Sequence, residues 1–395
     1  MSKHEINWHE LKDTEIVYVE HSLLQKLLAE GVRKAGSLSK LFMEFNTPQI
    51  YHISRGKNGI SVKNLKRMLE YANIPLEAAN DKILEIRKGN KSSIETPKFP
   101  INLRDPKIGF LIGHLVSDGC LYYDNSRKNL IRTKYCSDKQ ENIQLFSKNL
   151  NEVFGKVHYN MEYQRHCYMI RIGTGTVGEL FRKAGVPVGK KYALNSDLPW
   201  VVKEGNNGLK RQYLSAIFDD EGCVGTAPLP YLILSRNIHV PLNPDEIDDI
   251  EKYIVPLMKQ SFFPTNHQTK RIAVRKLKEA LLYHEKDKLL HKIMDSKPRI
   301  LVAESLLLKE EFAIDNSTYV MSFQQTPNKN YSVQTSLVIR KKEAVLRFYE
   351  NIGFNSSEKQ NKLKEALLRS GRLKENAQTV QHPCKENRRI LPSGP

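Results

Sequence analysis

Apolar residues in the first part of the chain recur at steps of three and four, the spacing of one buried helical face. Four such stretches follow one another: His21–Lys34, Leu38–Phe45, 48–56 and 61–72. Serine, threonine or proline precedes or opens the last three, and glycine follows the first and ends the third, as helix caps do. Residues 1–86 are therefore predicted to form a small all-α domain.

The third of these helices carries the candidate contacts to DNA. Ile50 and Ile53 would face the core, which leaves the polar side chains around them for a major groove, with Lys57 and Lys63 near phosphates. The stretch 37–75 resembles the helix-turn-helix of the Cro/C1 phage repressors, which implies a DNA-reading role. The alternative is an ordinary helical bundle with a solvated polar face. The candidate base-reading residues are Gln49, Tyr51, His52, Ser54 and Arg55.

Two segments lack this periodicity. Residues 87–103 include the run RKGNKSSIETPKFP, which is rich in Lys, Ser and Pro and predicts a linker. Residues 371–395 are polar and aperiodic, and we expect a disordered tail there.

One helix pattern occurs twice. Asp105 and Pro106 are typical of a helix start, and an apolar stripe follows as far as Asp118 and its glycine. About a hundred residues later a similar stripe ends at Glu221, again directly before glycine. The spacing fits one αβ unit, so each of two units would contribute one such helix.

The physics of such helices predicts a shared site. Gly113 and Ser215 are small residues that we assign to matching positions of the two helices. Small side chains there would let the helices approach closely and form a seam. Packed with the same polarity, the helices would bring their C-terminal carbonyls together with Asp118 and Glu221. Such a set of hard oxygen atoms favours a divalent cation. The alternative is two acidic helix ends before a glycine cap.

The nonapeptides LIGHLVSDG (111–119) and LSAIFDDEG (214–222) resemble the two motifs of single-chain LAGLIDADG homing endonucleases. The resemblance covers roughly residues 104–371 and implies an α+β fold of two pseudo-symmetric αββαββα repeats with antiparallel DNA-binding sheets. It also implies that Asp118 and Glu221 bind Mg²⁺. We expect the first repeat at 104–206 and the second at 207–370, with a helical insertion at about 270–312.

Alternating sequences between the motifs predict strands that carry DNA contacts. Basic side chains share one face of the first sheet, and polar ones share a face of the second; an ordinary solvated sheet face is the alternative. The candidates are Arg132, Lys134, Arg165 and Arg171 in the first repeat and Ser332, Gln334, Ser336 and Arg340 in the second.

The resemblance implies one basic residue near each acid, where it can polarise water or stabilise charge on a phosphoryl group. Lys191, or its neighbour Lys190, matches the first position and Lys359 the second. The alternative is a plain surface lysine. His114 departs from the motif, which has an apolar residue there, and we assign it no catalytic role.

The charge balance favours a polyanionic partner. The chain has 395 residues, 62 Lys and Arg against 44 Asp and Glu, and a net charge of +18. Nucleic acid is the first expectation, with an acidic membrane surface as the rival. No apolar run is long enough to span a membrane, the start lacks a signal peptide's apolar core, and the five cysteines form no C-x-x-C pair. We expect a cytoplasmic monomer with reduced thiols.

These patterns together predict a site-specific double-strand DNA endonuclease that uses Mg²⁺ and no covalent nucleophile. The resemblance implies cutting across the minor groove with short 3′ overhangs. Because splice-junction residues are missing, we interpret the chain as free-standing and not as an intact intein. The alternative is a non-cleaving scaffold of this kind, either a DNA-binding transcription regulator or an RNA-splicing maturase. A membrane-surface protein is a third, weaker alternative.

Overall fold

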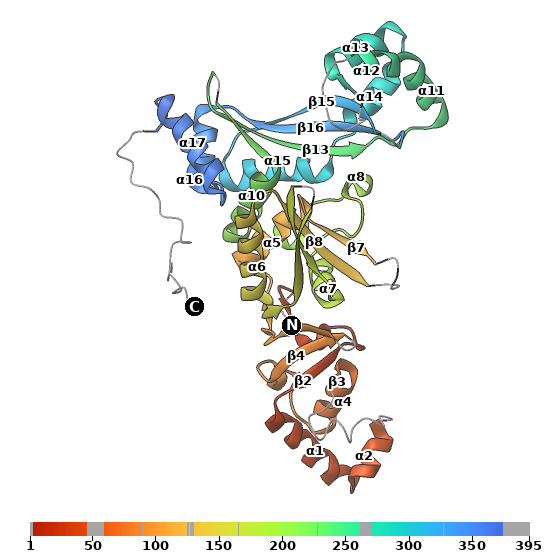
Figure 1. Cartoon of the computed structure of the whole chain (residues 1–395), viewed down its shortest axis with the longest axis vertical. Helices are drawn as coiled ribbons and strands as arrows, with labels where there is room; N and C mark the ends of the chain where they lie inside the picture. The colour runs from red at the N-terminus through yellow and green to blue at the C-terminus, as the bar shows by residue number, and fades with distance from the viewer. Residues whose placement is uncertain are drawn as a thin grey trace.

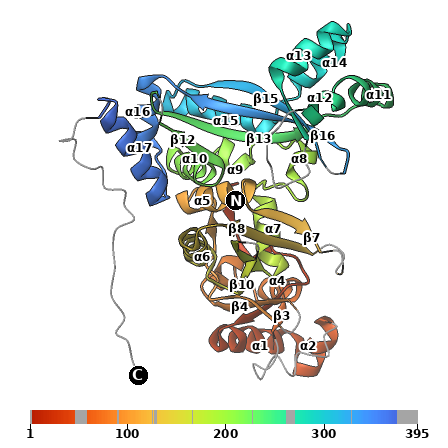
Figure 2. The same ribbon diagram turned by 45° about the horizontal axis from the view of Figure 1, so that its top comes forward.

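The computed structural model describes residues 3–45, 59–88, 91–124, 126, 130–164, 166–226, 228–260, 270–326 and 328–373. Three parts follow one another along the long axis of the molecule (Figure 1). We call them the N-terminal unit (residues 3–102), the first repeat (106–203) and the second repeat (207–369). Figure 2 shows the same order from a tilted direction, with α5 and α10 where the two repeats meet.

The N-terminal unit contains three of the four predicted helices. They are α1 (His21–Ala35), α2 (Leu38–Phe45) and α4 (Val62–Tyr71). Ser61 caps α4, because its hydroxyl accepts a hydrogen bond from the backbone N–H of Asn64. The remaining predicted helix lies outside the described residues, together with Lys57 and the candidate base-reading residues Gln49, Tyr51, His52, Ser54 and Arg55.

The expectation of an all-α unit is wrong, because an antiparallel sheet of order β3-β2-β4-β5-β9 packs with these helices. Its strands are short, and β2, β3 and β9 gain their hydrogen bonds from partners distant in sequence. The short elements of the unit are β1 (Glu5–Ile6), η1 (Trp8–Glu10), β2 (Ile16–Val19), β3 (Ile60–Ser61), η2 (Leu76–Ala79), β4 (Ile83–Lys88), β5 (Lys91–Glu95) and β6 (Ile101–Asn102).

The predicted linker is also corrected, because the segment forms strands that join the unit to the first repeat. Strand β5 pairs with β4 on one side and with β9 (Lys156–Val157) of the first repeat on the other. Its Ser93 and Ile94 are buried. Backbone pairing stabilises even a polar segment, since its N–H and C=O groups are satisfied by neighbouring strands. The N-terminal unit is therefore docked against the first repeat.

The first repeat has the predicted order αββαββα, with the short β9 added before its third strand. Its four-stranded antiparallel sheet has the order β10-β11-β8-β7. Two short helices, α8 (Lys191–Leu194) and α9 (Trp200–Lys203), lead to the second repeat. The elements of the repeat are α5 (Pro106–Val116), β7 (Cys120–Tyr123), β8 (Ile131–Ser137), α6 (Gln140–Phe154), β10 (Tyr159–Gln164), β11 (Cys167–Ile172) and α7 (Gly175–Lys183).

The second repeat has the same strand order, β12-β13-β16-β15, with β14 added at its edge. The predicted insertion occupies Pro244–Asp295, earlier than expected, because α15 belongs to the repeat itself. A separate apolar core lies between the inserted helices and the adjoining strands. The repeat contains α10 (Asn207–Glu221), β12 (Gly222–Gly225), β13 (Tyr231–His239), α15 (Arg299–Phe312), β15 (Ser317–Gln325), β16 (Tyr331–Ile339), α16 (Lys342–Asn351) and α17 (Ser357–Arg369). The insertion contains α11 (Pro244–Tyr253), α12 (Val255–Gln260), β14 (Lys270–Ala273), α13 (Val274–Tyr283) and α14 (Asp287–Asp295).

Candidate nuclease site at the helix seam

Helices α5 and α10 pack against each other in the centre of the molecule (Figures 1 and 2). A Cβ placed on Gly113 would lie 2.6 Å from the Cβ of Ala216 and 2.7 Å from the carbonyl oxygen of Tyr213. Gly113 is thus a seam residue, as predicted. The match to Ser215 is wrong by one position: Ala216 faces Gly113, and the Ser215 hydroxyl accepts a hydrogen bond from Asn355.

Both motif helices begin at side-chain caps. The carboxylate of Asp105 accepts a hydrogen bond from the N–H of Lys107, and the amide oxygen of Asn206 accepts one from the N–H of Leu209. The sequence therefore determines where each helix begins and which end carries the acid.

The two predicted lysines lie at equivalent places, one at the C-terminal end of each helix. The ammonium of Lys191 donates to the carbonyl oxygens of Ser117 and Gly119, the latter at 2.7 Å. That of Lys359 donates to the carbonyls of Phe218, Asp219 and Gly222. Burial lowers the pKa of both lysines, although nearby acids oppose the shift. Both lysines therefore cap carbonyls that the cation cage was expected to use.

Asp118 is exposed and makes no hydrogen bond or ion pair within the described part of the chain. Partial desolvation and the charge of Asp220 raise its pKa to about 6, against the opposing charges of Lys191, His114 and Lys359. An acid with a raised pKa, at a helix C-terminus and without a partner, is a candidate cation ligand.

Glu221 lies in a different environment. Its Oε1 accepts a hydrogen bond of 3.1 Å from Nη1 of Arg236, and its Oε2 lies 3.0 Å from the same nitrogen. Burial raises the pKa of Glu221 to about 7, Arg236 and Lys191 oppose this shift, and Asp118 adds to it. The charge of Asp118 is thus one of several that act on Glu221.

Arg236 is the centre of a buried polar group that sequence reasoning missed. Its guanidinium donates to both carboxylate oxygens of Glu304, at 2.7 and 3.1 Å, and to the carbonyl of Val116 at 3.2 Å. The hydroxyl of Tyr213 donates to Glu304 at 2.7 Å. No local sequence signal indicates this group, because its members come from three helices and a strand.

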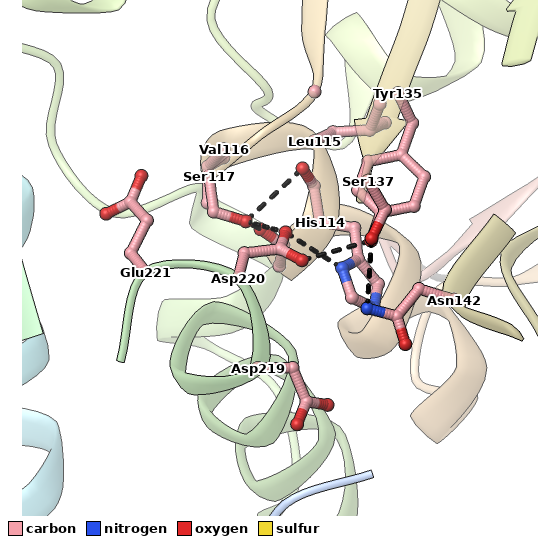
Figure 3. A network of polar contacts seen from close by, with 12 residues as sticks. His114, Leu115, Val116, Ser117, Tyr135, Ser137, Asn142, Asp219, Asp220 and Glu221 are labelled. Atoms are coloured by element: carbon pink, nitrogen blue, oxygen red, sulfur yellow. Dashed lines mark hydrogen bonds and ion pairs between the residues drawn. The ribbon is translucent and has the colours of Figure 1, made fainter. Parts of the chain in front are cut away.

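A second buried group surrounds Asp220 (Figure 3). Its carboxylate accepts hydrogen bonds from the hydroxyls of Ser117 and Tyr135 and lies 2.9 Å from Nδ1 of His114. Burial lowers the pKa of His114, but the charge of Asp220 and its hydrogen bond outweigh it, so the pKa is raised. Figure 3 shows Asp220 pointing toward these side chains and Glu221 pointing away from them. His114 is therefore a buried partner of Asp220.

The first sheet presents the predicted basic residues on its open face. Arg171 pairs in register with Lys134, and Arg132 lies two residues along the same strand as Lys134. Two of these charges are partly neutralised: Arg132 forms an ion pair with Asp124 at 2.9 Å, and Arg171 lies 3.5 Å from Glu162. Arg165 lies outside the described residues.

The corresponding face of the second sheet is polar and mostly uncharged. The hydroxyls of Ser235 and Ser336 are 2.7 Å apart, and Gln334 pairs in register with Asn237. Ser332 and Ser336 are buried, and Gln334 is half-buried. Arg340 follows β16 and is exposed.

A pocket of about 330 Å³ opens beside Glu221. Two cationic side chains, Lys191 and Arg236, line it together with one acid, Glu221. The other polar residues of its wall are Ser117, Asn195, Ser196, Ser235 and Asn237. Within the described residues no group of three or more His, Cys, Asp or Glu side chains could hold a metal ion.

The seam nevertheless fits a divalent cation in one respect: carboxylates outnumber the permanent cations there. Burial and neighbouring acids raise the pKa values of Asp118, Asp219 and Glu221. The opposing charges and hydrogen bonds only partly offset these shifts. A bound cation would remove this repulsion. The carboxylates are Asp118, Asp219, Asp220, Glu221 and Glu304, and the permanent cations are Lys191, Arg236 and Lys359.

Comparison with known proteins found no matching family model and no matching curated protein. Similar solved structures include full-length DUF199/WhiA from Thermatoga maritima, with 11% identity and a TM-score of 0.33 over 68% of this chain and 61% of that one. They also include I-DmoI in complex with DNA and Ca, with 11% identity and a TM-score of 0.34 over 62% of this chain and 88% of that one. A third is the homing endonuclease I-WcaI bound to its DNA recognition sequence, with 11% identity and a TM-score of 0.32 over 66% of this chain and 87% of that one. The chain thus spans about three fifths of the length of WhiA.

No helix in the described part of the chain combines the length and the apolar composition that crossing a membrane requires.

Proposed function

We propose that this chain is a site-specific DNA endonuclease of the LAGLIDADG type, which binds double-stranded DNA on its two sheets and hydrolyses phosphodiester bonds with Mg²⁺. One observation supports the proposal: helices α5 and α10 pack closely at Gly109 and Gly113, and an acid, Asp118 or Glu221, stands at the C-terminal end of each. Asp118 is unpaired there and its pKa is raised. A chain with a net charge of +18 supplies the attraction to a polyanion.

The two sheet faces carry side chains suited to different parts of the DNA. Lys134 and Arg171 on the first sheet are suited to phosphates, and Asn237 and Gln334 on the second sheet are suited to base edges. The positively charged side chains set the affinity, and the amides contribute sequence preference.

The seam residues would hold and tune the reactive centre. When bound, Mg²⁺ supplies Lewis-acid activation of water and stabilises the leaving oxygen. Asp118 would be its main ligand, with Glu221 beside it. Lys191 and Lys359 neutralise the helix ends, and the charge of each lowers the pKa of Asp118, so they favour its ionised form.

The test is to incubate the purified protein with randomised duplex DNA and either Mg²⁺ or Ca²⁺. We expect binding with both ions and cutting with Mg²⁺. Asp118→Asn should still bind DNA and lose cutting by two or more orders of magnitude, since a metal ligand at the reacting phosphate is removed. Asp138→Asn, an exposed acid at the end of β8, is the matched control and should cut normally.

A non-cleaving DNA-binding regulator is the second candidate function. The pairing of Glu221 with Arg236 favours it, because an internal cation occupies one of the two acids. Tight DNA binding without cuts in Mg²⁺ or Mn²⁺ would establish this alternative, and an Asp118→Asn variant that cuts like the native chain would refute the proposed site.

A further inference from the structure

The two acidic helix ends of the seam are not equivalent. Asp118 is exposed and makes no hydrogen bond within the described residues. Glu221 has Oε1 bonded to Arg236, and its Oε2 is buried without a hydrogen bond. The first acid therefore has carboxylate oxygens open to a cation from solvent, whereas the second faces a guanidinium that already carries a full positive charge.

Arg236 is not free to leave Glu221. Glu304, whose side chain is 0% exposed, holds the guanidinium through two parallel hydrogen bonds, and the Val116 carbonyl accepts a third. Withdrawing Arg236 would leave the Glu304 carboxylate buried without its counter-charge, which is strongly unfavourable. The guanidinium is thus a fixed internal cation at the second helix end.

The first repeat has no such cation at the matching position. In the two sheets Cys120 pairs with Lys134 and Cys223 pairs with Ile233, so the residue that matches Arg236 is Ser137. The Ser137 hydroxyl accepts hydrogen bonds from the backbone of Lys139 and the side chain of Asn142 and contacts neither acid. The two acidic helix ends therefore differ because the two repeats carry different residues, Ser137 and Arg236, at this position.

The lining of the pocket beside Glu221 also disfavours a second metal ion. Its charged lining consists of Arg236, Lys191 and the already paired Glu221, so two cationic side chains lie beside this acid and oppose a second metal ion there.

We propose that only the Asp118 end supports hydrolysis, so that the chain nicks one strand of its duplex. This inference rests on the proposed endonuclease function. In the nick, a water oxygen bonds to phosphorus and the bond to the 3′ oxygen breaks. The water releases a proton to solvent, and the leaving oxygen takes one up, which gives a 5′ phosphate and a 3′ hydroxyl.

The first experiment follows strand cutting. Duplexes retained in Ca²⁺ from a randomised pool are cloned into a supercoiled plasmid, which is then incubated with the full chain and Mg²⁺. The open circle should accumulate as the product, with the nick always in the same strand. Linear plasmid formed as early as the open circle, or nicks shared equally between the strands, would overturn the inference. Plasmid that stays supercoiled while bound would overturn the endonuclease function itself.

The second experiment counts metal ions and needs no activity. Mn²⁺ titrated into the protein with its selected duplex, followed by electron paramagnetic resonance, should show one tight ion per chain. Asp118→Asn should lose it, and Glu221→Gln should keep it. Two ions of similar affinity, or loss of the ion in Glu221→Gln alone, would contradict the proposal.

A double variant tests the cause of the inequality. Arg236→Met with Glu304→Gln removes the internal cation together with the fully buried Glu304 charge, so that Glu221 is the carboxylate left without the guanidinium. Circular dichroism establishes that the variant is folded. A folded variant should bind a second Mn²⁺ at Glu221, and a folded variant with one ion would show that Arg236 is not what excludes metal there.

Discussion

Asp118 shows how a single residue reveals a site. An exposed aspartate normally gains little from its neighbours, yet desolvation and Asp220 raise the pKa of this carboxyl to about 6. The charged form is therefore less favourable in the folded chain than in the unfolded one. A protein keeps such an acid at some cost in stability, and functional sites are where such costs concentrate.

This cost predicts how stability depends on pH. The folded-state pKa of Asp118 is above its unfolded value of 3.8, so ionisation reduces stability as the pH rises from about 4 to about 6. In metal-free buffer Asp118→Asn should unfold at a higher temperature than the native chain at pH 7.5, and the difference should disappear near pH 4. Thermal unfolding monitored by circular dichroism measures this. Equal midpoints at pH 7.5 would mean that the Asp118 charge is not destabilising.

At the scale of elements, the pair α5 and α10 carries the site. The backbones approach because Gly109 and Gly113 have no side chain: a Cβ on Gly109 would lie 2.2 Å from the carbonyl oxygen of Leu209. The lysine caps at the helix ends then satisfy carbonyls that would otherwise be orphaned. Close packing and capping together fix the two helix ends that are followed by Asp118 and formed by Glu221.

Gly113→Ala should therefore destabilise the chain. The added methyl would overlap Ala216 and the Tyr213 backbone, and forced overpacking of this kind costs about 1–3 kcal/mol, more than the helix propensity that alanine gains. Urea unfolding should show a lower midpoint. Gly173→Ala is the matched control, since its methyl would meet only the flexible end of Arg132 at 3.3 Å, and it should change stability by less than about 0.5 kcal/mol. Equal effects in both variants would contradict the packing argument.

At the scale of the whole molecule, the N-terminal unit is fastened to the first repeat in several places. Strand β5 pairs with β9, and the ammonium of Lys183 donates a hydrogen bond to the carbonyl oxygen of Glu10. The hydroxyl of Thr176 donates to Glu15 at 2.9 Å across the same boundary. One apolar core continues from this unit through both repeats. A unit fixed in this way holds one orientation relative to the first repeat.

Hydrogen exchange tests this docking. If residues 91–95 form a paired strand, their backbone amides and those of 156–157 should exchange at least tenfold more slowly than in the urea-unfolded chain, because ladder amides exchange only on opening. Mass spectrometry of the peptides covering both segments gives the rates. Exchange at the unfolded rate in native buffer would restore the linker interpretation.

The sequence by itself determined the local features. Helices α1, α2, α4, α5 and α10 follow from apolar periodicity and from caps such as Ser61 and Asn206, because both signals lie within a few residues. The doubled motif also indicated the acids and the lysines at the helix ends.

Only the tertiary structure decided the contacts between distant segments. Strand β5 has a polar sequence and becomes a strand through partners on both sides, which no local pattern records. How closely Gly113 approaches Ala216 and the backbone of Tyr213 depends on the packing of α10 against α5. The internal cation at Glu221 exists because Arg236 and Glu304, far apart in sequence, are buried together. Electrostatic pairing depends on distance in space, so the inequality of the two acids appears only in the folded chain.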